Sequence, residues 1–254
     1  MFGMITDTGE IFSKTWQGYA DAFPSSMRVT HPEMEIALAG IAVPLFNLAF
    51  PKSRTEMSRA EFNRLLGEFG EILKRRGVAG LVFLRTGQTE ESAGIAEMFR
   101  MPGMVAEELL PPKRALGEFV IREVAGAAMA EEIARLNVVC HEMESKDVAE
   151  LTCAGLWGGP NHGFLLYAEG TAVAGGSASF VEGVSYIGWM ATLPEYRGRG
   201  FAEALLRHMD AFMRPRYGVK ETVLHATEMG RPVYERMGFR AVDEFAAYLC
   251  APGE

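Results

Sequence analysis

The sequence predicts an α+β fold built on a mixed β-sheet, and three observations carry this prediction. Residues 164–192 read as three consecutive strands separated by the tight turns Glu169–Gly170 and Glu182–Gly183. A glycine-rich turn then leads directly into an amphipathic helix. The adjacent Pro111 and Pro112 mark a boundary, because proline ends both helices and strand ladders, and an earlier half with its own elements precedes them.

The second half has alternating and helical patterns in a clear order. Its predicted elements are the strand Glu118–Glu123, the helices Ala127–Val139 and Ser145–Trp157, a loop at Gly158, Gly159, Pro160 and Gly163, the strands Phe164–Ala168, Thr171–Phe180 and Ser185–Thr192, the helix Phe201–Met213, which stops near Pro215 and Gly218, and the strand Thr222–Ala226.

The turn at residues 193–202 is the most informative segment of the chain. Such a turn leaves backbone N–H groups over the helix N-terminus, where the helix dipole adds partial positive charge. The site therefore suits a phosphate or pyrophosphate. Gly198 and Gly200 allow a ligand to approach, because a Cβ there would hold it away from the backbone. Arg197 and Arg199 add positive charge at the rim.

Two motifs of this half resemble one known family. Thr192-x-Pro194 followed by Arg197-x-x-Gly200-x-Ala202 resembles the acetyl-CoA pyrophosphate loop (R/Q-x-x-G-x-G/A) of the GNAT acyltransferase superfamily. The segment 227–239, with a tyrosine on a short helix and a closing Gly-Phe, resembles the second signature of that superfamily. By this resemblance, residues 117–254 are expected to form a catalytic domain with the GNAT acyl-CoA N-acyltransferase fold and to use acetyl-CoA as co-substrate.

The resemblance also implies which residues hold acetyl-CoA. The backbone of Met190, Ala191 and Thr192 would pair with the pantetheine arm as a further strand would, and one of their N–H groups would polarise the thioester carbonyl. The pyrophosphate would bind to Arg197, Gly198, Arg199, Gly200, Phe201, Ala202 and Glu203. Thr227 stands where the family often has an asparagine and would touch the CoA arm, and this departure leaves its role open.

Tyr234 matches the family tyrosine and is the predicted general acid, which would protonate the departing thiolate. The sequence pattern alone favours a half-buried aromatic of an amphipathic helix, and the Gly238–Phe239 register favours the role in catalysis. The general base stays open among several candidates: Glu182, His225, Glu228, His162 and the pair Glu142 and Glu144. Trp189, on the fourth strand, would either wall the acceptor pocket or pack in the core, as would Trp157. We expect no covalent acyl-enzyme, because no nucleophilic triad is evident.

The first half repeats some of this order. Ser58-x-x-Glu61 is a capping-box pattern that opens a helix, and the strand Val78–Leu84 and a helix over Glu91–Phe99 follow. The apolar face of the first of these helices consists of Phe62, Leu65, Leu66, Phe69, Ile72 and Leu73.

We interpret residues 1–116 as a degenerate GNAT-like domain, with an unrelated α+β cap as the alternative. The helix at Phe62 corresponds to the one at Phe201, but no R-x-x-G-x-G/A turn precedes it. Phe99 stands near the position of Tyr234. The prediction is therefore two tandem GNAT-like domains with one acetyl-CoA site.

Composition limits the classes of function. Residues 117–254 hold 12 Lys and Arg against 19 Asp and Glu, which accounts for most of the net charge of −8, and such an acidic half does not suit nucleic acid. The negative charge of this half would attract a cationic acceptor over long range, or would contribute to solubility alone. No segment approaches the ~20 apolar residues of a membrane span. Cys140, Cys153 and Cys250 are isolated thiols, which favours the cytoplasm and no metal site.

The leading prediction is an acetyl-CoA-dependent N-acetyltransferase that acts on the primary amine of a small molecule by direct attack. We expect it to be a monomer or homodimer. Two alternatives stay open: a protein or peptide N-acetyltransferase, and a non-catalytic acyl-CoA-binding protein.

Overall fold

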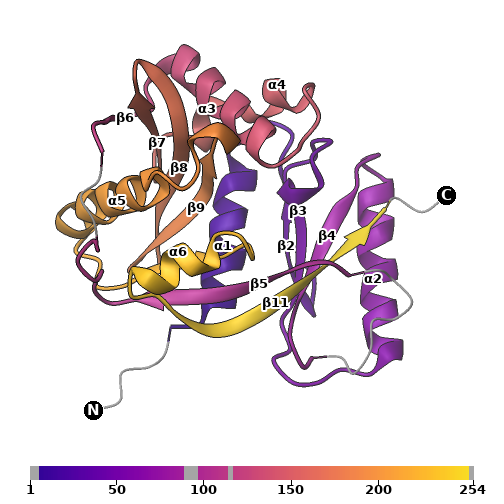
Figure 1. Ribbon diagram of the computed structural model, residues 1–254. Coiled ribbons are helices and arrows are strands. Elements are labelled where there is room, and N and C mark those ends of the chain that lie inside the picture. The colour runs from indigo at the N-terminus through magenta and orange to yellow at the C-terminus, as the bar shows by residue number, and fades with distance from the viewer. Residues whose placement is uncertain (1–5, 89–96, 114–116, 252–254) are drawn as a thin grey trace. The chain divides into compact units, whose positions relative to one another are not determined.

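The computed structural model describes residues 6–88, 97–113 and 117–251 (Figure 1). Contacts within the chain divide it into two compact units. The larger unit comprises Met1–Thr6 and Met104–Arg240, and the smaller unit comprises Asp7–Gly103 and Ala241–Glu254. Each unit has its own helices, strands and hydrophobic core.

The larger unit combines helices with strands of mixed orientation. Its strands follow the order β5-β10-β9-β8-β7-β6, in which β9 and β10 run parallel and β6 to β9 run antiparallel. The elements are β5 (Glu97–Ala106), which begins in the smaller unit, β6 (Val120–Glu123), α3 (Gly126–Cys140), α4 (Asp147–Leu151), η2 (Ala154–Leu156), β7 (Asn161–Ala168), β8 (Thr171–Val181), β9 (Val184–Thr192), η3 (Pro194–Tyr196), α5 (Phe201–Tyr217), β10 (Thr222–His225) and α6 (Arg231–Arg236).

Helices α3 and α5 cover opposite faces of these strands. A Cβ added at Gly175 of β8 would lie 3.1 Å from Ile133 of α3, whereas one at Gly176 would lie 3.4 Å from Met209 of α5. Because successive strand residues point to opposite faces, the two helices pack on different sides of the sheet. Glycine at position 175 lets α3 approach closely, whereas glycine at position 176 makes room for the Met190 sulfur of β9, which would lie 2.6 Å from a Cβ there.

Two predicted elements of this unit differ in the structure. The helix predicted over Ser145–Trp157 is shorter, since α4 ends at Leu151, and the indole Nε1 of Trp157 donates a hydrogen bond to the Leu151 carbonyl (2.7 Å) as the chain turns back. Gly163 lies inside β7 rather than in a loop. A Cβ there would approach Trp157 and Val124 to 3.1 Å, so this glycine serves close packing rather than a turn.

The smaller unit has a similar strand–helix–strand arrangement. Its strands follow the order β1-β2-β3-β4-β11, in which β3 and β4 run parallel while β1–β2, β2–β3 and β4–β11 run antiparallel. The elements are α1 (Thr8–Asp21), β1 (Met27–Arg28), β2 (Met34–Leu38), η1 (Pro44–Phe46), β3 (Asn47–Pro51), α2 (Arg59–Lys74), β4 (Gly80–Arg85) and β11 (Arg240–Cys250).

The amphipathic helix predicted from Phe62 is confirmed as α2, and its capping box is present. Five of its six predicted apolar residues are buried in the core of the unit, with Ile72 packed at its edge. The helix predicted over Glu91–Phe99 is wrong at its end, because residues 97–99 belong to β5; residues 91–96 lie outside the described ranges.

The C-terminal strand does not stay with the larger unit. Within the smaller unit, β11 pairs antiparallel with β4 over Phe245–Cys250 and Gly80–Arg85. The boundaries of the compact units therefore differ from the predicted division at residue 116. Nothing in the sequence indicated which strand the last strand would pair with. The assignment of 1–116 as a degenerate domain and 117–254 as the catalytic domain stays a prediction.

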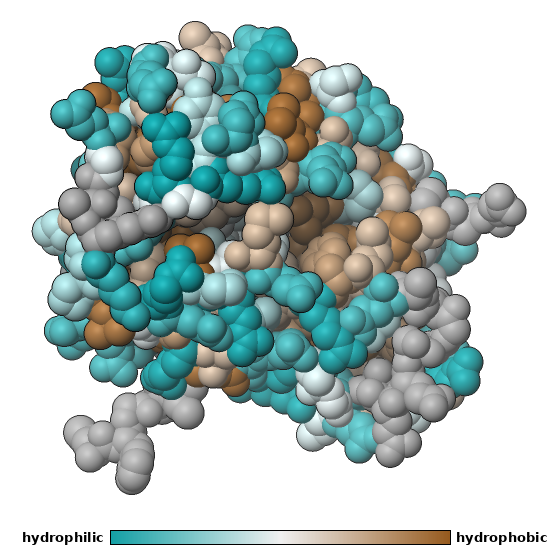
Figure 2. All heavy atoms as spheres, in the orientation of Figure 1, coloured by the Kyte–Doolittle hydropathy of each residue, from teal (hydrophilic) through white to brown (hydrophobic). Residues whose placement is uncertain are grey.

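The visible surface carries mainly hydrophilic side chains, with hydrophobic residues in groups of limited extent (Figure 2). Among the described residues, no helix combines the length and apolar character required to cross a membrane.

Candidate active site

The parallel strands β9 and β10 separate toward their carboxyl ends. In the described part of the chain, their pairing ends at Ile187 and Leu224. Strand β9 continues to Thr192, whereas β10 ends at His225. The edge of β9 that faces β10 is therefore open to a further extended ligand beyond this point.

A β-bulge lies in this open stretch. The register between β8 and β9 shifts between Gly175 and Ser177, and Trp189 has a φ of +54°, which is unusual for a tryptophan. On the β8 side, Ala191 and Thr192 keep regular partners. The bulge thus changes the direction of the backbone close to Met190 while the end of the strand stays anchored.

The predicted anion-binding turn connects this strand to α5. Gly198 has a φ of +74° and Gly200, the N-cap of α5, a φ of +89°. A Cβ at Gly198 would meet open space, so its glycine reflects the backbone conformation rather than packing. The N-cap glycine has no side chain to accept from the first helical N–H groups, and Ala204 N–H donates to the Gly200 carbonyl (3.0 Å). The preceding N–H groups of Phe201, Ala202 and Glu203 point toward the helix N-terminus.

Two arginines flank the turn in different ways. The Arg197 Nε donates to the Thr192 carbonyl (3.1 Å), which joins the turn to the end of β9. The Arg199 guanidinium lies over the rings of Tyr196 and Phe201, 5.3 and 5.1 Å from their centroids. Arg199 is half-exposed and also forms an ion pair with Glu169 (3.3 Å), and its role at the rim stays a prediction.

Tyr234 is buried on α6. Its ring packs edge-on against Phe239 with centroids 5.9 Å apart, and a Cβ at Gly230 would lie 3.0 Å from it. Burial raises the pKa of Tyr234 to about 12, so the phenol keeps its proton at neutral pH. The Thr227 hydroxyl accepts a hydrogen bond from the Gly230 N–H (3.2 Å) and so orders the start of this short helix.

Most of the residues predicted as candidates for the general base either contact other residues or lie far from the bulge. His162 is buried, with Nδ1 2.6 Å from Glu123 Oε1 and Nε2 2.6 Å from the Tyr217 hydroxyl, so both ring nitrogens are engaged. Glu182 lies in the turn before β9, at the end of the strand opposite to Met190. The structure does not bring these two residues to the open strand edge.

The other candidates have partners of their own or are exposed. His225, at the end of β10, has Nδ1 3.3 Å from the Tyr186 hydroxyl. Glu144 forms an ion pair with Lys146 (2.8 Å). Glu142 and Glu228 are exposed.

Sequence reasoning missed His141, at the end of α3. Its ring lies edge-on to Trp189 of the bulge, with centroids 6.1 Å apart, and the Trp157 ring also packs edge-on to that indole, with centroids 6.3 Å apart. His141 is exposed in part, but loss of water around its ring and the Arg197 charge lower its pKa, which favours the neutral imidazole. No motif marks this histidine, because only the fold brings the end of α3 to β9.

Cys140, next to it, shows no sign of a nucleophile. Burial raises the pKa of its thiol, although Arg197 opposes the shift. Within the described ranges, no three His, Cys, Asp or Glu side chains gather as metal ligands would.

Comparison with known proteins identifies the class of this domain. Residues 160–241 match the family model of the acetyltransferase (GNAT) domain. No curated protein matches the chain. GNAT acetyltransferases use acetyl-CoA, and the match therefore supports an acetyltransferase with that co-substrate.

Solved structures extend the likeness of fold beyond this segment. A GCN5-related N-acetyltransferase from Kribbella flavida is 18% identical with a TM-score of 0.72, covering 100% of this chain and 98% of that one. One from Sphaerobacter thermophilus is 16% identical with a TM-score of 0.55, covering 87% and 77%. A tandem GNAT protein from the clavulanic acid biosynthesis pathway is 13% identical with a TM-score of 0.55, covering 87% and 79%. The GNAT fold is therefore confirmed, and the first half also aligns with GNAT structures.

Proposed function

We propose that this chain transfers the acetyl group of acetyl-CoA to the primary amine of a small molecule within a ternary complex. One observation carries the proposal. Within residues 188–203, the unpaired edge of β9 leads directly into the start of α5, which has no capping side chain. An extended pantetheine arm suits the edge, and a pyrophosphate suits the N–H groups at Gly200.

The residues of the site have separate tasks in this proposal. A backbone N–H of Met190–Thr192 donates to the thioester oxygen as its negative charge develops. The amine nitrogen then forms a bond to the carbonyl carbon, and the C–S bond breaks. Tyr234, protonated at neutral pH, gives its proton to the departing sulfur. His141 accepts the proton lost by the amine, directly or through water.

The binding part of the proposal is tested by thermal unfolding with and without acetyl-CoA. Binding to the native state raises its stability by linkage, about 2.7 kcal/mol at a hundredfold excess over Kd. Gly198→Ala should lose most of this gain. The matched control is Gly183→Ala, which has a similar positive φ (+84° against +74°) and equally open surroundings, but lies in the turn before β9. No stabilisation of the wild-type chain, or equal loss in both variants, would contradict the proposal.

The catalytic part needs a second measurement. Release of free thiol from acetyl-CoA should occur with members of a panel of small amines. Stabilisation without release on any amine would favour a non-catalytic acyl-CoA-binding protein, and release with peptides alone would favour a peptide N-acetyltransferase.

We also propose that the chain acts in the cytoplasm as a monomer or homodimer. None of the three cysteines, all of which lie in the described ranges, is in a disulfide, which suits a reducing compartment.

A further inference from the structure

A cavity of about 440 Å³ lies in the smaller unit, at the carboxyl ends of its parallel strands. Strands β3 and β4 pair at Leu48–Leu81 and Ala49–Val82, and the next residue of each strand, Phe50 and Phe83, lines the cavity. Ligands of open α/β sheets commonly bind at this end of parallel strands. The volume falls within the range of small-molecule sites, roughly 300–1,000 Å³.

The inner wall of the cavity is apolar. The rings of Phe50 and Phe83 lie nearly parallel, 16° apart, with centroids separated by 5.6 Å. Phe245 of β11 adds a third ring, and all three side chains are buried. This wall suits the apolar body of a ligand.

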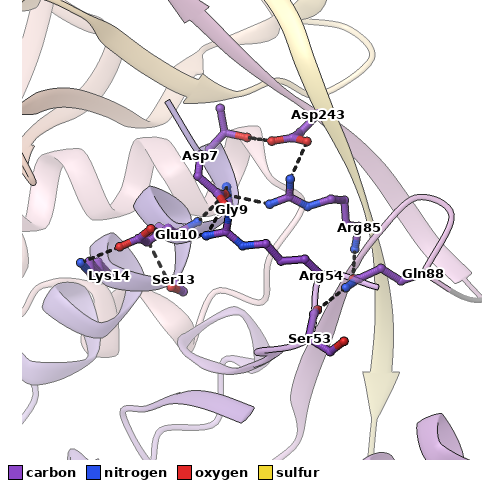
Figure 3. A network of polar contacts seen from close by, with 11 residues as sticks. Asp7, Gly9, Glu10, Ser13, Lys14, Ser53, Arg54, Arg85, Gln88 and Asp243 are labelled. Atoms are coloured by element: carbon purple, nitrogen blue, oxygen red, sulfur yellow. Dashed lines mark hydrogen bonds and ion pairs between the residues drawn. The ribbon is translucent and has the colours of Figure 1, made fainter. Parts of the chain in front are cut away.

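A fixed polar cluster borders that wall (Figure 3). The Arg85 guanidinium donates to Asp7 Oδ1 (2.7 Å) and to Asp243 Oδ1 (2.8 Å). Asp7 also accepts from the N–H groups of Gly9 (3.0 Å) and Glu10 (3.1 Å) at the start of α1. Burial raises the pKa of Asp7, but these N–H and Arg85 bonds outweigh it, so the net shift is downward and Asp7 is ionised.

Arg54 differs from Arg85 because it is replaceable. Its side chain is 66% exposed and lines the cavity from the segment after β3. Its Nη2 lies 2.7 Å from Asp7 Oδ2 and 3.6 Å from Glu10 Oε2 (Figure 3). If Arg54 turns away, Asp7 keeps Arg85, and Glu10 keeps Lys14 at 2.9 Å. An exposed pair of this kind contributes little to stability, so a ligand can take the arginine at small cost.

We propose that this cavity binds a small organic carboxylate with an apolar body, and that Arg54 takes its carboxylate group. The three rings accept the apolar body. A ligand of high negative charge is disfavoured, because Asp7, Glu10 and Glu35 also line the cavity. An amine is disfavoured as well, because the carboxylates of Asp7 and Glu10 are already matched by cations of the chain.

The test is titration calorimetry of the full chain with phenylacetate, beside its neutral amide phenylacetamide and the amine phenethylamine. Phenylacetate should bind in the millimolar range or tighter, and more tightly than either analogue. Arg54→Gln should weaken phenylacetate binding about tenfold or more, as expected for loss of a charge-assisted contact. The control Arg28→Gln removes another exposed arginine of the same unit, one outside the cavity lining, and should leave binding unchanged.

Three results would overturn the proposal: no binding of phenylacetate at millimolar concentration, equal binding by the Arg54 and Arg28 variants, or equal binding of phenethylamine. The proposed acetyl-CoA site lies at the start of α5 and shares no residue with this cavity. Whether acetyl-CoA binds or fails to bind therefore does not change the results expected for phenylacetate. Because Arg54 is largely exposed, its replacement leaves the core intact and the comparison stays interpretable.

Discussion

The two units contain the same local arrangement with different chemistry at one point. In the larger unit, α5 connects the parallel strands β9 and β10; in the smaller unit, α2 connects β3 and β4. Helix α5 begins at Gly200, in a left-handed conformation without a capping side chain. Helix α2 begins at Ser58, whose hydroxyl accepts from the Glu61 N–H, while the Glu61 carboxylate accepts from the Ser58 N–H (2.9 Å).

This difference shows how one arrangement can keep or lose an anion site. The N–H groups of a helix start require acceptors. In α2, the capping box supplies acceptors for the Ser58 and Glu61 N–H groups, and the bonds from the Ser58 N–H and hydroxyl lower the pKa of Glu61, which keeps its charge there. In α5, no capping side chain accepts from the first N–H groups, and the proposed acetyl-CoA site uses them. The two starts share one local feature, because Ser58 and Gly200 are each followed three residues later by glutamate, Glu61 and Glu203.

The largest expected effect comes from making α5 begin like α2. Gly200→Ser introduces a capping hydroxyl three residues before Glu203 and disfavours the positive φ of +89°. We expect acetyl-CoA affinity to fall about 300-fold or more, the equivalent of two charge-assisted hydrogen bonds. Calorimetric titration with acetyl-CoA measures this loss.

The control for that variant is Gly183→Ser, at a φ of +84° in the turn before β9. It imposes similar backbone strain away from the helix start, so affinity should stay near that of the wild-type chain. An equal loss in both variants would assign the effect to strain rather than to the helix start.

The next effect concerns the proton that reaches the leaving sulfur. Tyr234→Phe should lower kcat roughly 100-fold, as general acids contribute, while the Kd for acetyl-CoA stays within a fewfold of the wild-type value. Tyr217→Phe is the matched control, since Tyr217 contacts His162 rather than the site. Steady-state kinetics that show the same kcat for Tyr234→Phe would remove this residue as the acid.

A smaller effect is expected in the pH dependence of the reaction. The pKa of His141 is lowered below its ordinary value of 6.5, so the imidazole is neutral at pH 7 and gains a proton only in more acidic solution. The kcat/KM should therefore fall as the pH drops through that lowered pKa. His141→Gln should remove this acidic limb and lower kcat/KM about tenfold at pH 7.

His208 offers a control for the pH profile, because burial also lowers its pKa but it lies on α5 against Phe164. His208→Gln should retain the acidic limb. If the limb survives in His141→Gln instead, another group accepts the proton.

The smallest expected effect is on the stability of the full chain and arises in the smaller unit. Ser58→Ala removes the cap of α2 and should lower the free energy of unfolding by about 1 kcal/mol, measured by urea denaturation. Acetyl-CoA affinity should not change. Ser13→Ala, inside α1, should cause no such loss, because alanine is the better helix former. A change in acetyl-CoA affinity on Ser58→Ala would contradict the claim that only the start of α5 takes part in acetyl-CoA binding.

The sequence predicts these helix starts well because their signals are local. The glycines of the turn and the Ser58–Glu61 capping box each lie within a few residues, and both appear in the structure as expected. The helix α2 follows from its apolar periodicity in the same way. The helix prediction for residues 97–99 was wrong because their apolar residues suit a strand as well as a helix.

Features that combine distant segments could not be predicted. His141 reaches the bulge only through the packing of α3 on the sheet. The polar cluster of the smaller unit joins Asp7, Arg54, Arg85 and Asp243, which come from four separate parts of the chain. The partner of β11 likewise depends on pairing with β4, far away in sequence.

Hydrogen–deuterium exchange tests the central claim most directly, because it reports on backbone N–H groups at both helix starts in one experiment. With acetyl-CoA present, exchange should slow at the amides of residues 198–203, while the amides of residues 58–63 should exchange as before. Protection at the start of α2, or no protection at the start of α5 under saturating acetyl-CoA, would contradict the account.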